Sequence, residues 1–148
     1  MQHLVDHLGR PAGRFYCKIF RRGVLLDVVD EPNLVVDLAK QHHAILLGSA
    51  DANRRVSRFG VGTNGTAPAA GNTGLTGAIT KTVDAVTYPV AGSVAFSFSL
   101  LTGEANGMAI MEFGLFTASG VLYARKTRLS PLAKESDISL SGTWTIAF

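Results

Sequence analysis

The chain has 148 residues, the length of a single domain, and a formal net charge of +3 from 14 basic and 11 acidic residues. Hydrophobic residues make up 47% and charged residues 17%, a composition that favours apolar surface covered by another subunit, so we expect a homo-oligomer or larger assembly. The small basic excess is spread along the chain, which argues against a nucleic-acid partner. No apolar run has the length that a bilayer requires, and the single cysteine, Cys17, excludes an internal disulfide and a zinc site built from thiolates.

Residues 1–13 end in a turn-forming stretch of Gly and Pro and are predicted to be an N-terminal arm that docks on an adjacent subunit. They lack a basic start followed by an apolar stretch, so no signal peptide is expected and assembly in a cytoplasm is the default. Residues 14–148 are predicted to form one domain. Its first part, residues 14–20 and 23–29, is rich in β-branched and aromatic side chains and predicts a hairpin.

The clearest helical pattern covers about residues 34–47. Asn33 can cap its first turn, and Gly48 is a natural stop because glycine accepts the left-handed conformation. Apolar residues recur at the spacing of one helical face. The residues predicted to form that core-facing stripe are Val35, Leu38, His42, Ile45 and Leu46.

From Arg55 onward the hydrophobic period becomes two, which is typical of strands. A long loop of small and polar residues is predicted at residues 62–77. Strands are predicted at residues 56–61, 78–88, 93–100, 108–117, 121–127 and 138–148. These features predict a mainly β, antiparallel fold, a β-sandwich or jelly-roll-like sheet with one packed α-helix.

Residues 60–65 match the G-x-G-x-x-G motif of dinucleotide-binding proteins. That motif needs a helix directly after it, whose N-terminal amides hold the pyrophosphate. Pro68 and several turn-forming residues follow here instead, so no cofactor is expected.

Histidine and acidic residues form no catalytic or metal-binding pattern. His3 and His7 lie four residues apart and His42 and His43 are adjacent, but no acidic third ligand joins either pair. The acidic residues near the predicted helix are explained by capping and by the helix dipole. We therefore predict no metal site and no catalytic residue, and an enzyme is the least expected class.

Glu112 lies in an otherwise apolar strand, where an unpaired carboxylate would be costly. We predict an ion pair with an arginine on the neighbouring strand, such as Arg125. The alternative is a general acid with a raised pKa, which would need a second polar partner that the sequence does not identify.

Arginines and the polar loop are the candidates for contacts with other subunits, because arginine suits ion pairs at interfaces. The alternative is that these residues are solvated strand ends. Nucleic-acid contact is disfavoured because aromatic stacking residues are not interleaved with the charges. The candidate interface residues are Arg10, Arg14, Arg54, Arg55, Arg58, Asn64, Thr66, Arg125 and Arg128.

Residues 59–75 resemble the signature G-x-G-T-x-x-T-x-P-A-x-x-x-T-x-L of tail and baseplate-region proteins of tailed bacteriophages. Residues 110–116, 120–125 and 138–148 are similar to further segments of these proteins, which carry E-x-G-L-F, G-x-L-x-A-R and a closing W-T-I-like strand in that order. The resemblance covers about residues 34–148.

This resemblance implies a virion structural protein without catalytic activity, which contacts other virion proteins in the tail, baseplate or tail-fibre attachment region. One alternative is a capsid decoration or cement protein, since small β-sandwiches serve there too. Another is a receptor- or carbohydrate-binding module. Such a module needs exposed aromatic side chains, and the strand pattern leaves only Tyr88 and Tyr123 for that purpose.

Overall fold

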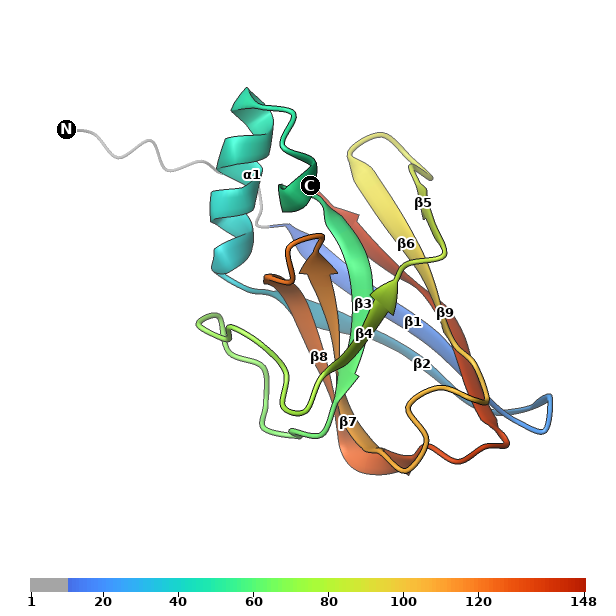
Figure 1. Ribbon diagram of the computed structural model, residues 1–148. Coiled ribbons are helices and arrows are strands. Elements are labelled where there is room, and N and C mark those ends of the chain that lie inside the picture. The colour runs from blue at the N-terminus through green and yellow to red at the C-terminus, as the bar shows by residue number, and fades with distance from the viewer. Residues whose placement is uncertain (1–10) are drawn as a thin grey trace.

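A computed structural model describes residues 11–148 (Figure 1). This part of the chain forms a mainly β structure with one α-helix and one short 3-10 helix. The elements are β1 (Ala12–Arg21), β2 (Val24–Val35), α1 (Leu38–Gly48), η1 (Ala52–Arg54), β3 (Val56–Gly62), β4 (Ile79–Thr82), β5 (Ala85–Thr87), β6 (Ser93–Leu100), β7 (Ala109–Thr117), β8 (Leu122–Ala133) and β9 (Ile138–Ala147).

The strands form one curled sheet in the order β4-β3-β7-β8-β2-β1-β9-β6-β5, and every neighbouring pair is antiparallel. Because the sheet curls, β5, β6, β9, β1 and most of β2 form one layer, while β4, β3, β7 and β8 form the other (Figure 1). The predicted mainly β, antiparallel fold with one helix is confirmed.

The two layers are joined at a corner between β4 and β5. The sequence pattern predicts one strand over residues 78–88, but the chain bends at Val83 and Asp84. The Val83 N–H donates to the Ser57 carbonyl in one layer at 2.9 Å, and the Asp84 N–H donates to the Ser97 carbonyl in the other at 2.7 Å. The chain therefore crosses between the layers here and brings the two edges of the sheet together.

Aromatic rings from both layers fill the space between them. Phe59 stacks on Phe98 with ring centroids 4.2 Å apart, and Phe15 lies 4.7 Å from Phe113. Trp144 meets Phe15 edge to face at 4.9 Å and is fully buried. Because the Phe59–Phe98 and Phe15–Phe113 contacts each join one layer to the other, this core holds the sandwich closed.

Helix α1 begins at Leu38, four residues later than predicted. Leu34 and Val35 continue β2 and pair with Arg125 and Ala124 of β8, so sheet pairing extends past the predicted cap. Asn33 consequently caps no helix, and its carboxamide lies buried against Gly13, where any β-carbon would overlap it. The Asn33 cap and the helix start were therefore predicted wrongly.

The packed face of α1 is narrower than the predicted stripe. His42 is buried as predicted, together with Ala39. Leu38 and Leu46 are half-buried, whereas Ile45 is exposed. Since only a narrow stripe of α1 is covered, the helix packs shallowly on the sandwich.

The predicted N-terminal arm overlaps the sheet at its end. Ala12 and Gly13 already belong to β1 and pair with Ala147 and Ile146 of β9. The rest of the predicted arm, including its contact with another subunit, lies outside the described residues.

Candidate functional site

Glu112 of β7 and Arg125 of β8 form a buried ion pair, as predicted. Their side chains are 1% and 2% exposed, and the Arg125 Nε donates to Glu112 Oε2 at 2.7 Å. The register places Gly114 opposite Arg125, so the arginine reaches diagonally across the strand pair to Glu112. A buried pair of this kind is satisfied only if further hydrogen bonds take up the remaining polar atoms.

Those further bonds all go to the loop between β3 and β4, which we call the 63–78 loop. Glu112 Oε1 accepts from the backbone N–H groups of Asn64 at 3.1 Å and Thr76 at 2.7 Å. The two terminal nitrogens of Arg125 donate to Asn72 Oδ1 at 3.0 Å and to the Asn64 carbonyl at 2.9 Å. The ion pair therefore anchors both ends and the middle of the loop, and both oxygens of the Glu112 carboxylate have hydrogen-bond partners.

Gly62 leaves the space that this anchor needs, and Gly114 leaves space for the apolar side chains beside it. A β-carbon on Gly62 would lie 2.5 Å from Glu112 Oε1 and 2.8 Å from the Thr76 carbonyl. A β-carbon on Gly114 would lie 2.9 Å from the Phe116 ring. The segments around residues 60–75, 112–116 and 122–125 thus meet at one buried point.

The outer side of the 63–78 loop is open to solvent. Asn64 and Thr66 are exposed, and the Asn64 Oδ1 accepts the Thr66 backbone N–H at 3.0 Å. This side chain to backbone bond shapes a tight turn. Because hydrogen bonds to the buried Glu112 and Arg125 fix the loop, its exposed residues have a defined conformation. This lowers the conformational entropy that is lost when a partner binds.

The candidate arginines do not gather into one site. Arg14 pairs with Asp30 at 2.7 Å on the exposed face of β1, and Arg54 pairs with Asp51 at 3.2 Å beside η1. Arg58 donates to Thr80 Oγ1 at 2.8 Å, and the half-buried Arg128 donates to the Ser130 carbonyl. Arg55 is exposed, whereas Arg10 lies outside the described residues.

Arg125 is the candidate interface residue that the structure corrects. Its guanidinium is buried, and Glu112, Asn72 and Asn64 occupy its nitrogens. It cannot contact another subunit without breaking the loop anchor. The partners Asn72 and Thr76 were missed, because no local pattern in the loop marks which residues turn inward.

Apolar side chains at the start of β2 form an exposed patch that the sequence pattern did not predict. Val24, Leu25, Leu26 and Val28 are 42% to 70% exposed. Strand β1 pairs with β2 from Val24 to Asn33, but β8 pairs with β2 only at its last two residues, so the start of β2 is a sheet edge. The signal in the sequence is the mixture of apolar residues with Asp27 and Asp30, which is unusual for a strand buried on both faces.

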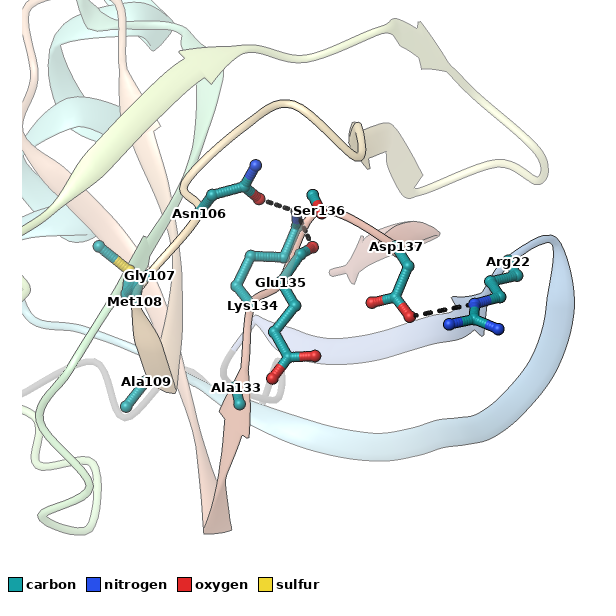
Figure 2. Close-up of a pocket in the computed structure, with 10 residues that line it drawn as sticks. All are labelled: Arg22, Asn106, Gly107, Met108, Ala109, Ala133, Lys134, Glu135, Ser136 and Asp137. Atoms are coloured by element: carbon teal, nitrogen blue, oxygen red, sulfur yellow. Dashed lines mark hydrogen bonds and ion pairs between the residues drawn. The ribbon is translucent and has the colours of Figure 1, made fainter.

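A hollow of about 770 Å³ lies between the β1–β2 turn, the β6–β7 loop and the β8–β9 loop (Figure 2). Lys134 lines it and is 1% exposed, and burial lowers the pKa of its ammonium group. Its three protons go to Asn106 Oδ1 at 2.8 Å, the Glu135 carbonyl at 3.2 Å and the Thr102 carbonyl at 3.3 Å. With every donor used, Lys134 ties two turns together and is not free to react.

Histidines of α1 face the sandwich without forming a metal site. His43 Nε2 lies 2.6 Å from the hydroxyl of Tyr123, while His42 Nδ1 is buried and has no hydrogen-bond partner in the described residues. Burial lowers the pKa of both imidazoles. Within residues 11–148, no three His, Cys, Asp or Glu side chains are grouped as metal ligands would be. His3 and His7 lie outside this range.

No helix in residues 11–148 combines the length and apolar character needed to cross a membrane.

The G-x-G-x-x-G motif is followed by a loop, as predicted. The structure describes every residue between Gly65 and β4, and none of them belongs to a helix that could hold a pyrophosphate. No protein-family model, curated protein or solved structure matches this chain.

Proposed function

We propose that this chain is a non-enzymatic structural protein of a tailed-bacteriophage virion, assembling by protein–protein contacts in the tail, baseplate or tail-fibre attachment region. Its partners would be other virion proteins and further copies of itself. The proposal of a virion rests on the resemblance of residues 34–148 to tail and baseplate-region proteins. The proposal of assembly rests on the exposed apolar patch of β2.

The loop anchor supports the link between the resemblance and a structural role. Segments that carry the resemblance contribute Gly62, Glu112, Gly114 and Arg125 to one buried cluster. The side chains of Glu112 and Arg125 hold the 63–78 loop in place, and Gly62 leaves room for the Glu112 carboxylate. The residues shared with such proteins would then maintain the conformation of a loop, which a protein that packs against neighbours requires. They would not serve catalysis.

The β2 patch carries the assembly proposal because large apolar side chains at a sheet edge are costly to leave in water. Strand addition at this edge is disfavoured: a register shift interrupts β2, the Val28 N–H is taken by Asp27 Oδ1 at 2.8 Å, and Pro32 lacks an N–H. We therefore expect partners to cover the side chains of the patch, without extending the sheet.

The first test locates the protein in purified particles of the phage that encodes it. Immunogold labelling should decorate tails or baseplates. Label on full heads would instead support the capsid decoration alternative, and absence from particles would end the virion proposal.

The second test removes the patch. The double variant Leu25→Glu/Leu26→Glu should fold normally by circular dichroism but fail to enter particles, because charged residues cannot be covered by an apolar partner surface. Leu47→Glu is the matched control, since Leu47 is also exposed but lies on α1. Normal incorporation of the double variant would refute the role of the patch.

A receptor- or carbohydrate-binding module remains the second candidate function, on one observation. Tyr88 is exposed and lines a pocket, whereas Tyr123 lines the same pocket but is buried, so its ring is not available at the surface as predicted. Glycan-array binding that is lost in Tyr88→Ala would favour this function over the structural one.

A further inference from the structure

A pocket of about 560 Å³ lies at the end of the sandwich that α1 covers. Its walls come from α1, from residues 54–57, from the β4–β5 corner and from β6. In Figure 1 these elements lie away from the β1–β2 turn and the β2 patch. The volume falls within the range of small-molecule sites in proteins.

The interior of this α1 pocket is mainly apolar. Val56 and Val94 lie on opposite layers of the sandwich, and Phe96 and the ring of Tyr123 are buried beside them. Tyr88 is 78% exposed, so the pocket has an aromatic ring available to a ligand as well as a buried floor. Such a surface favours a flat or branched apolar body.

Histidine supplies polar groups inside the pocket. His42 lines it and is buried, yet its Nδ1 has no hydrogen-bond partner among the described residues. A buried polar atom without a partner costs free energy that a bound group can recover. His43 also lines the pocket, but its Nε2 is already held by Tyr123.

The charged lining groups favour an anion. Among the charged side chains of the lining, two are arginines, Arg54 and Arg55, and one is a carboxylate, Asp84. Arg54 is paired with Asp51, whereas Arg55 is exposed and forms no ion pair within residues 11–148. An anionic group on a ligand can therefore pair with the Arg55 guanidinium.

We propose that the α1 pocket binds a small aromatic or branched aliphatic carboxylate. The apolar body lies between Val56, Val94 and Tyr88, and the carboxylate pairs with Arg55. This binding activity goes beyond the structural role and does not depend on it.

The test uses three probes with the full chain: hydrocinnamate, hydrocinnamyl alcohol and acetate. Titration followed by backbone amide NMR shifts should show hydrocinnamate binding about tenfold more tightly than the alcohol, because one charge-assisted hydrogen bond contributes roughly that factor. Acetate, which lacks the apolar body, should bind least. The shifted amides should belong to α1, residues 54–57 and β5.

Two variants separate the charge from the apolar body. Arg55→Gln should abolish the preference for the acid over the alcohol, while Tyr88→Ala should weaken both. Arg14→Gln is the control, because Arg14 is an exposed arginine of β1 that does not line the pocket. Equal affinity for acid and alcohol in the wild type would overturn the proposal. Shifts confined to other elements, or a glycan that displaces hydrocinnamate, would overturn it too.

Discussion

Within residues 11–148, the buried ion pair of Glu112 and Arg125 has a hydrogen-bond partner for each of its side-chain nitrogens and oxygens. Glu112 accepts three hydrogen bonds and Arg125 donates three, all within the sandwich or its loop. Buried ion pairs add little net stability compared with apolar residues of similar volume. Their value here is specificity: only one loop conformation places Asn64, Asn72 and Thr76 on the pair.

Removing one partner of the pair should be strongly destabilising. Arg125→Met leaves the Glu112 carboxylate buried without its cation, and we expect a loss of about 3–5 kcal/mol in the free energy of unfolding, measured by urea denaturation. Arg14→Met, which breaks the exposed pair with Asp30, should change stability little. If Arg125→Met were as stable as the wild type, the pair would not be the loop anchor.

Gly62 is needed because of the close approach of Glu112. Gly62→Ala should cost about 1–3 kcal/mol, since the new methyl group must displace the carboxylate or the Thr76 carbonyl. Gly71→Ala in the same loop is the control, because a β-carbon there meets nothing within 4 Å. Thermal unfolding of both variants checks this, and equal melting temperatures would contradict it.

At the scale of elements, α1 is held on the sandwich by a small set of interactions. A narrow stripe around Ala39 and His42 packs on the sandwich, and His43 reaches the Tyr123 hydroxyl. Burial lowers the pKa of His42, and the nearby charge of Arg54 lowers it further. Protonation of His42 therefore opposes the docking of this helix.

This arrangement predicts that acid destabilises the fold. The pKa of His42 is lower in the folded than in the unfolded chain, so between the two values the unfolded chain binds more protons and stability falls as pH decreases. Urea midpoints should fall from about pH 7.5 to about pH 5, and the fall should be smaller in His42→Leu. Gln41→Leu, an exposed neighbour on α1, should keep the wild-type pH dependence. An unchanged dependence in His42→Leu would show that this histidine is not responsible.

The whole molecule depends on one core shared by both layers. Trp144 belongs to β9, which pairs with β1 on one side and β6 on the other. Its ring contacts Phe15, which in turn contacts Phe113 in the opposite layer. Loss of either layer would expose the same aromatic cluster.

The described domain should therefore unfold in one step. Trp144 is the sole tryptophan and is fully buried, so its fluorescence should resist quenching by iodide in the native state. Unfolding curves from tryptophan fluorescence and far-ultraviolet circular dichroism should coincide. Two separated transitions would mean that the layers unfold independently.

The sequence by itself determined the local pattern of most strands and one specific contact. Alternation of apolar and small polar residues located β6 and β9 because a half-covered sheet imposes a period of two. The pairing of Glu112 with Arg125 was predictable because a carboxylate in an apolar strand requires a cation nearby. The long loop was predictable from its glycine, threonine and proline content.

Tertiary structure decided the features that depend on neighbours distant in sequence. Leu34 and Val35 have an apolar pattern that suits a helix or a strand equally, and pairing with β8 made them strand. The break at Val83 exists because its N–H and that of Asp84 bond to different layers. Whether Val24 to Val28 lie in the core or at an edge depends on how far β8 follows β2. The sequence of this segment does not determine how many residues of β2 pair with β8.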